Sequence, residues 1–196
     1  MTVHIVVRQE MPASAERTFD LIHDYARRLS WDTMLRSAYI DGGGPPGKGA
    51  VAVCTARRML GGYSFRTRYV TFNRPQVAAI KLEGHQPFFA SWAASIRHEP
   101  LGPERSLATY TMTFTCKPSW AARVIEPAAR WGFRRETSRR LAALSAALER
   151  QVSTPDRRVG SAGGAGGRRQ RVRHRRRGQG RAVGGVAGFE APAVGQ

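Results

Sequence analysis

The sequence predicts an α+β domain over residues 1–152, in which a curved antiparallel sheet of about six to seven strands wraps around a long C-terminal helix. Three observations carry this prediction. A strand-like segment followed by helical spacing opens the chain, short apolar runs separated by turns fill its middle, and a helical pattern covers residues 119–150. The length of 196 residues suits one domain with an appendage.

The opening segment predicts a strand and then two short helices. Apolar and polar residues alternate over residues 3–10, as in a half-buried strand, and Pro12 ends the alternation. Ser14 is a favourable N-cap, and apolar residues recur at helical spacing over residues 14–30. Trp31 follows the break after these helices.

Consecutive strand-like runs then predict an antiparallel meander, because the separators are too short for crossover helices. The glycine-rich segment 42–47 is a loop, and a strand-like AVAVCT follows it instead of a helix. A dinucleotide-binding or phosphate-binding loop is therefore excluded. The expected strands cover residues 34–41, 49–57, 63–73, 76–83, 88–98 and 106–116.

The alternation within these runs predicts which side chains face the long helix, since successive side chains of a strand point to opposite faces of the sheet. In the last run, one apolar set shares a face and four threonines share the other with Leu107. The side chains expected to face the helix are Ala108, Tyr110, Met112, Phe114 and Cys116, with Ala90, Trp92, Ala94 and Ile96, and with Tyr63, Phe65 and Tyr69.

The closing segment, residues 119–150, predicts a long amphipathic helix that packs on the sheet. Pro127 is expected to kink it or to start its main part. Two apolar stripes are expected: Trp120, Val124, Ala128 and Trp131, and then Phe133, Thr137, Leu141, Leu144 and Leu148. The arginines Arg134, Arg135, Arg139 and Arg140 are expected on a solvated face, with weak contact to an anionic membrane as the alternative.

The order of these segments resembles the START-like (SRPBCC) superfamily with its helix-grip fold, which includes polyketide cyclase/dehydrase-like and lipid-transport proteins. The resemblance lies in MPASAERTFDLIHDYARRLSWDTMLRSAYID at residues 11–41 and in FRRETSRRLAALSAALER at residues 133–150. It covers residues 1–152 and implies a deep apolar cavity between the sheet and the long helix. It also implies a ligand such as a lipid, a quinone or a polyketide, and in some members cyclisation or dehydration.

A cavity of this kind binds mainly through buried apolar area, and a few polar groups orient the ligand. The alternative is that the same side chains fill a solid core. For Tyr69 and Tyr110, a ligand carbonyl, an ordered water or a neighbouring serine would each satisfy a buried hydroxyl. The residues expected to bind the ligand are Tyr69, Trp92, Tyr110, Met112, Phe114, Trp131 and Phe133.

The alternative function is that of a polyketide cyclase or dehydratase, for which a general acid or base is needed beside a stabilised enolate. His85, in the turn EGHQP, and Tyr110 are the candidates, whereas His98 lies near a strand end. An exposed position is the simpler interpretation for both histidines. The histidines and cysteines have no metal-ligand spacing, so neither a metal nor another cofactor is expected.

Arg66 and Arg68 alternate with the inward Tyr69, and a solvated face is the simpler interpretation than substrate contact. Cys54 and Cys116 are expected to be reduced thiols on strands. Neither a signal peptide nor a membrane-spanning apolar segment is evident, so a soluble, cytoplasmic protein is expected.

A basic Gly/Arg-rich tail, residues 153–196, is expected to be disordered, because its composition cannot bury enough apolar surface to fold. Residues 155–196 contain ten basic and two acidic residues, and so carry +8 of the total formal charge of +18. The run at residues 168–181 can attract nucleic acid or anionic lipid without sequence preference. An incidental tail and a segment read in a shifted frame are the alternatives.

Overall fold

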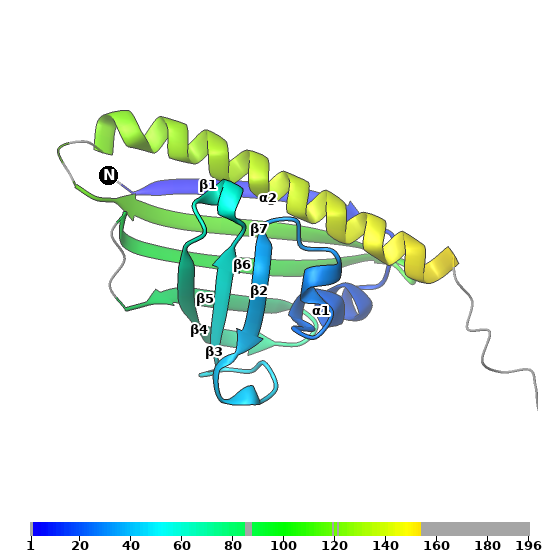
Figure 1. Ribbon diagram of the computed structural model, residues 1–196. Coiled ribbons are helices and arrows are strands. Elements are labelled where there is room, and N and C mark those ends of the chain that lie inside the picture. Colours follow the sequence, from blue (N-terminus) through cyan, green and yellow to red (C-terminus); the bar gives the residue numbers. More distant parts are fainter. Residues whose placement is uncertain (1, 85–87, 119, 121, 154–196) are drawn as a thin grey trace, which may run out of the picture. The chain divides into compact units, whose positions relative to one another are not determined.

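One antiparallel sheet collects all the strands that the alternation predicts (Figure 1). The computed structural model describes residues 2–84, 88–118, 120 and 122–153. Its strand order is β1-β7-β6-β5-β4-β3-β2, so the predicted meander and the helix-grip arrangement are confirmed, with β1 paired to β7. The strands are β1 (Val3–Met11), β2 (Leu35–Ile40), β3 (Val51–Ala56), β4 (Ser64–Asn73), β5 (Val77–Glu83), β6 (Phe89–Gly102) and β7 (Arg105–Cys116).

The helices begin where the sequence places their caps. The backbone N–H of Arg17 donates to the Ser14 hydroxyl oxygen at 3.3 Å, which caps α1 (Ala15–His23). A 3-10 helix, η1 (Arg28–Ser30), follows α1, and η2 (Asp41–Gly43) and η3 (Arg58–Leu60) lie in later loops. The long helix α2 (Ala122–Ser153) contains Pro127 in its interior, so the proline does not start it.

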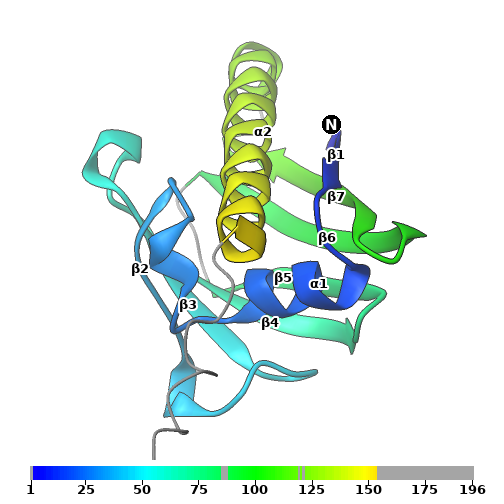
Figure 2. The ribbon, with the colours of Figure 1, turned by 90° about the vertical axis from the view of Figure 1, so that its right-hand side faces the viewer.

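The sheet curves around α2, with β1 and β7 on one side of the helix and β2 and β3 on the other (Figure 2). The second predicted stripe of α2 faces the core: Leu141, Leu144 and Leu148 are buried together with Phe19 and Trp31. The helix therefore closes the core with its C-terminal half, at the same end of the sheet as α1 (Figures 1 and 2).

The first predicted stripe of α2 is exposed, contrary to expectation. Trp120, Val124 and Trp131 keep 85%, 80% and 65% of their surface in contact with solvent, and Ala128 is exposed as well. The reason is geometric: at 3.6 residues per turn, this stripe lies on the face of the helix opposite Phe133. A continuous helix presents only one of two opposite faces to the sheet.

Two β-bulges change the predicted inward sets. The pairing of β6 with β7 shifts register between Phe89 and Ser91. This shift leaves Ala90 exposed and turns Phe89 inward in its place. Pairing of β4 with β5 shifts between Tyr69 and Thr71, so that Phe72, three residues after Tyr69, packs against the core. An alternation pattern cannot locate such an extra residue.

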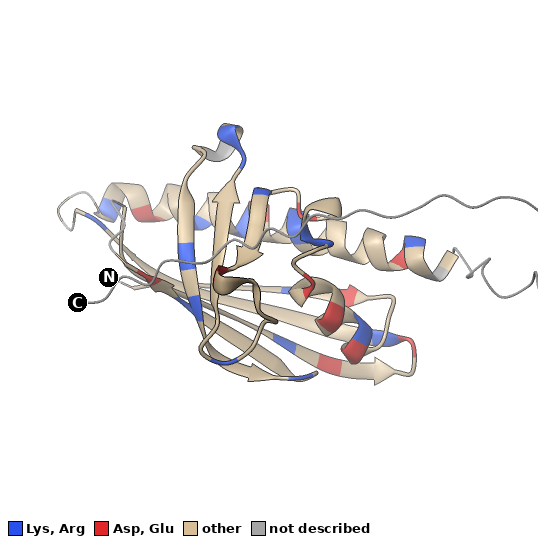
Figure 3. Ribbon diagram, turned by 60° about the horizontal axis from the view of Figure 1, so that its bottom comes forward, with Lys and Arg blue, Asp and Glu red and all other residues tan. Residues whose placement is uncertain are grey.

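Several surface charges of the sheet and α1 form ion pairs. Arg74 donates to Asp20 at 2.7 Å and Arg17 to Glu104 at 3.2 Å, while arginines recur along α2 (Figure 3). Arg66 and Arg68 pair with Asp41 and Glu83 on the outer face, as the solvated-face interpretation requires.

The predicted tail of residues 153–196 lies outside the described residues except for Ser153, so its disorder and its contacts stay predictions. Within the described part of the chain, no helix is both long and apolar enough to cross a membrane. The cytoplasmic location also remains a prediction.

His98 is not the exposed histidine that the sequence predicts, because β6 continues past it to Gly102. Its side chain is 3% exposed and its ring centroid lies 5.6 Å from that of Phe19. Neither ring nitrogen has a hydrogen-bond partner among the described residues. Burial lowers the pKa of His98 to about 4.

This buried histidine predicts a stability change with pH. Its unfolded-state pKa is near 6.5, so this group binds more protons in the unfolded chain as the pH falls from 6.5 to 4, and its own contribution lowers the unfolding free energy by about 3 kcal/mol over this window. The variant His98→Leu is expected to flatten this part of the profile of unfolding free energy against pH, measured with urea. His4→Leu, an exposed change, serves as the control. An unchanged profile in His98→Leu would contradict the assignment.

Candidate functional site

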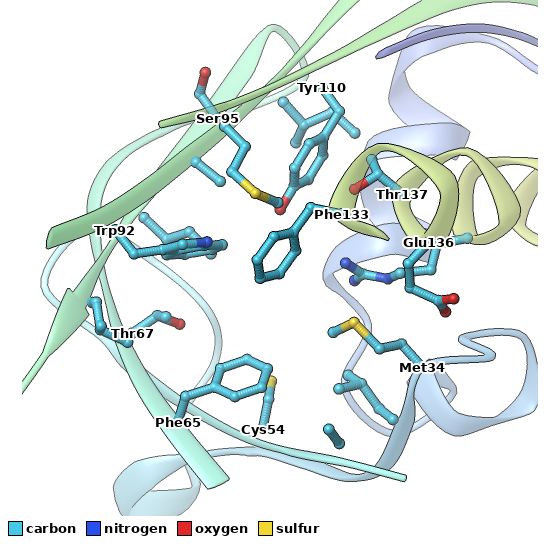
Figure 4. A pocket seen from close by; sticks show the side chains of 18 of the residues that line it. Met34, Cys54, Phe65, Thr67, Trp92, Ser95, Tyr110, Phe133, Glu136 and Thr137 are labelled. Atoms are coloured by element: carbon cyan, nitrogen blue, oxygen red, sulfur yellow. The ribbon is translucent and has the colours of Figure 1, made fainter. Parts of the chain in front are cut away.

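A cavity of about 620 Å³ lies between the concave face of the sheet and α2 (Figure 4). Its lining side chains are mostly apolar. The central strands contribute small residues, and the aromatic residues stand around them. The small residues that the strands contribute to the lining include Cys54, Ala56, Thr67, Ala78 and Ala94. The short side chains of the central strands leave room for a ligand between the larger side chains around them.

Six of the seven residues predicted to bind the ligand line this cavity: Tyr69, Trp92, Tyr110, Met112, Trp131 and Phe133. Phe114 does not line it. Its side chain is fully buried, with its ring centroid 5.7 Å from that of Phe89 and 5.2 Å from that of Phe133. Phe114 therefore supports Phe133 from behind, while the Phe133 ring points into the cavity (Figure 4).

The exposed aromatic residues of the lining mark where the cavity meets solvent. Tyr63 and Phe88 are about half exposed, and their rings meet edge to face with centroids 5.2 Å apart. Trp131 lines the cavity and is also largely exposed, with the Arg135 guanidinium 5.4 Å from its ring centroid. These residues form the rim of the cavity.

A buried ion cluster lies at the other, inner part of the lining. Arg140 on α2 donates to the Asp32 carboxylate from Nε at 3.2 Å and from Nη2 at 2.9 Å. Arg28 on η1 donates to the same carboxylate from Nε at 2.9 Å. The Asp32 side chain is 0% exposed and the two arginine side chains are 11% and 12% exposed. Both arginines line the cavity, whereas Asp32 lies behind them.

The charges in this cluster stabilise one another. Burial raises the pKa of Asp32, but Arg140 and Arg28 outweigh it and hold that pKa at about 2. For Arg140, burial lowers the pKa, and the Asp32 carboxylate more than reverses this effect. Burial raises the pKa of Tyr110 against the opposing influence of the two arginines. At neutral pH the cluster therefore holds two cations, one anion and a protonated tyrosine.

A hydrogen-bonded chain runs beside the cluster from α1 to β4. The Tyr69 hydroxyl lies 2.9 Å from His23 Nδ1 and 3.0 Å from the Tyr25 hydroxyl. Burial raises the pKa of both tyrosines and lowers that of His23 well below 6.5, with Arg28 adding to the effect on the histidine. All three side chains line the cavity, so neutral, polar groups accompany the arginines there.

The sequence reasoning missed this polar group of Tyr25, Arg28, Asp32 and Arg140, and it placed Arg140 wrongly on a solvated face. A signal was present for two of these residues. Arg140 follows Phe133 by seven residues, so it lies on the buried side of the helix. Arg28 precedes Asp32 by four, the spacing of a helical ion pair.

Of His85, the arginines of β4 and the two cysteines, only Cys54 joins the cavity among those that the structure describes. His85 lies outside the described residues. Arg66 and Arg68 point away from it and pair with acids on the outer face. Cys54 and Cys116 are free and buried, and Cys54 lines the cavity. Over the described ranges, no group of three or more His, Cys, Asp or Glu side chains is placed to hold a metal ion.

Fold and site together define a helix-grip domain with a ligand-sized apolar cavity. The chain belongs to the family of polyketide cyclase/dehydrase and lipid transport proteins, whose pattern it matches over residues 2–149. The predicted START-like resemblance is thus confirmed. No curated protein matches the sequence.

Solved structures of similar fold include enzymes and a START protein. The ZhuI aromatase/cyclase from Streptomyces sp. R1128 is 18% identical with a TM-score of 0.63, covering 78% of this chain and 96% of that one. A START superfamily protein from Mycobacterium smegmatis is 19% identical with a TM-score of 0.59, covering 76% and 98%. Norcoclaurine synthase from Thalictrum flavum is 13% identical with a TM-score of 0.60, covering 76% and 87%. At these identities the likeness shows the fold.

Removing the buried anion is expected to destabilise the domain strongly. Asp32→Asn leaves Arg28 and Arg140 facing each other without a counter-charge, which costs about 3–5 kcal/mol of unfolding free energy. The matched control is Asp41→Asn, which breaks an exposed pair with Arg66 and should cost far less, because solvent screens such a pair. Urea unfolding of both variants measures the difference. Equal losses would show that the cluster does not stabilise the fold.

Proposed function

We propose that this protein binds or carries a small hydrophobic molecule, such as a lipid, a quinone or a polyketide-like compound, in the cavity between the sheet and α2. The observation that carries the proposal is the cavity of about 620 Å³ with its mostly apolar lining. Membership of a family that includes lipid transport supports it.

The size of the cavity is sufficient for useful affinity. Pockets for small molecules typically span about 300–1,000 Å³ and are mainly apolar with a few placed polar groups. A ligand that buries about 300 Å² of apolar surface gains roughly 7 kcal/mol before the cost of immobilising it. The rim aromatics Tyr63, Phe88 and Trp131 offer such a ligand an apolar entrance.

Polyketide cyclisation or dehydration is the second candidate, and the family name and the ZhuI aromatase/cyclase fold favour testing it. Within the cavity, Tyr110 supports it as a hydrogen-bond donor toward an enolate, because its raised pKa keeps the hydroxyl protonated. Incubation with a poly-β-keto substrate separates the two candidates. Turnover lost in Tyr110→Phe would favour the enzyme, and binding without turnover would favour the carrier.

Filling the cavity tests the binding proposal. Ala94 lies on the lining and is 6% exposed, so Ala94→Phe places a ring inside the cavity. We expect the affinity for the neutral fluorescent probe N-phenyl-1-naphthylamine to fall at least about tenfold, since about 1.4 kcal/mol of lost contact suffices for that change. Fluorescence titration of the full chain measures it.

The neighbouring residue gives the matched control. Ala93 precedes Ala94 on β6 and points to the opposite face of the sheet, so Ala93→Phe adds the same ring outside the cavity. Its affinity for the probe should equal that of the unmodified protein. If the probe binds equally well to both variants, or does not bind the unmodified protein, the proposed cavity site is wrong.

A further inference from the structure

The inner part of the cavity has an excess of positive charge that no protein group in the cluster neutralises. Arg28 and Arg140 share one carboxylate, that of Asp32, so the cluster carries a net charge of +1. The anion is the member that does not reach the lining. The cavity surface at this point is therefore cationic, with its counter-ion behind it.

The other charged groups of the lining do not cancel this excess. Glu136 lines the cavity with a side chain that is 17% exposed, but Arg139 lies 4.0 Å from its carboxylate. Arg135 lies at the rim against Trp131. Glu136 and Arg139 thus balance each other, and Arg135 adds a further positive charge.

Hydrogen-bond donors remain available beside this charge. Arg28 uses Nε for Asp32 and Nη1 for the carbonyl of Ile22, and its Nη2 has no partner among the described residues. The Tyr110 hydroxyl points into the cavity (Figure 4). Two kinds of donor, a guanidinium and a tyrosine hydroxyl, therefore face the same space.

The chain from His23 supplies a third donor. His23 is neutral at pH 7, and its buried Nε2 has no partner among the described residues. When the proton lies on Nδ1, Nε2 carries a lone pair, and no buried N–H is left unpaired. His23 then donates to Tyr69, Tyr69 donates to Tyr25, and the Tyr25 hydroxyl is free to donate into the cavity.

We infer that the ligand is amphipathic and carries one negatively charged oxygen, which binds to Arg28, Tyr25 and Tyr110 while its apolar part fills the rest of the cavity. The inference rests on the proposed binding function and narrows its ligand class. A carboxylate and an ionised enol or phenol share this chemistry. Charge-assisted hydrogen bonds to such an oxygen are about twice as strong as neutral ones, so the acid is favoured over its neutral counterpart.

Matched pairs of probes test the inference on the full chain at neutral pH. The carboxylate pair is 11-(dansylamino)undecanoic acid and its methyl ester, and the enol pair is 2-hydroxy-1,4-naphthoquinone and its methyl ether. We expect the acid to bind about tenfold more tightly than its neutral partner in at least one pair. The pair that shows the preference identifies the source of the charged oxygen. Fluorescence titration and intrinsic tryptophan quenching measure the affinities.

Variants locate the preference. Arg28→Gln is expected to lower the affinity for the preferred acid to that for its neutral partner. The affinity of this variant for the neutral partner should stay within about twofold of that of the unmodified protein. Arg134→Gln, which removes the same charge from an exposed position outside the lining, should keep the preference. Tyr25→Phe provides a second variant that retains the ion cluster. It should lower the affinity for the acid and leave the affinity for the neutral partner unchanged.

The outcomes separate this inference from the function on which it rests. Equal binding of acid and neutral partner in both pairs overturns the charged-oxygen inference and leaves the apolar cavity in place. A preference that survives in Arg28→Gln and in Tyr25→Phe also overturns it. Failure of all four probes and of N-phenyl-1-naphthylamine to bind overturns both.

Discussion

The Asp32 carboxylate joins α2 to the segment that follows α1. It accepts hydrogen bonds from Arg28 in η1, from Arg140 in α2 and from the backbone N–H of Met34 at 3.1 Å. A carboxylate with no exposed surface costs several kcal/mol to desolvate, so its partners have to stay in place. Because Arg140 is held toward Asp32, the rotation of α2 about its axis is fixed. Phe133, two turns earlier on the same face, is thereby directed into the cavity.

The fixed rotation of α2 explains why the interior stays hollow. Protein cores normally contain few voids larger than a water molecule. Here, Ala78 and Ala94 on the central strands face α2 across a curved sheet, and neither is long enough to reach it. The helix cannot move down to fill the space, since Leu144 and Leu148 already close the core at one end. The cavity thus has two causes. The side chains of the central strands are small, and the packing of Leu144 and Leu148 keeps α2 at a distance from them.

The sequence predicted the elements well, because the features that specify them are local. Alternation over residues 107–116 correctly gave the inward face of β7, and the spacing from Phe133 to Leu148 gave the buried stripe of α2. The β-bulges were not predicted, because the alternation of apolar and polar residues does not show the extra residue at Ala90. The prediction for α2 was also wrong in part. Both of its apolar stripes were assigned to the core, although they lie on opposite faces of the helix.

The cavity walls were predictable and its polar end was not. Aromatic residues on the inward face of a strand indicate a cavity wall, and six of the seven predicted residues line the cavity. The ion pair between Asp32 and Arg140 joins residues 108 positions apart, and its existence depends on how the sheet folds around the helix. Helical spacing alone places Arg140 on the buried side, but it does not supply the anion that makes burial of an arginine tolerable.

The protonation states at this polar end favour holding a ligand over transferring protons. A general acid or base works best when its pKa lies near the working pH. Burial moves the pKa of His23 well below neutrality and those of Tyr25 and Tyr69 upward, away from it. These groups keep fixed protons and present a constant pattern of donors. Such a pattern orients a bound molecule, and it would also stabilise an enolate. A reaction in this cavity would therefore need its base from another group.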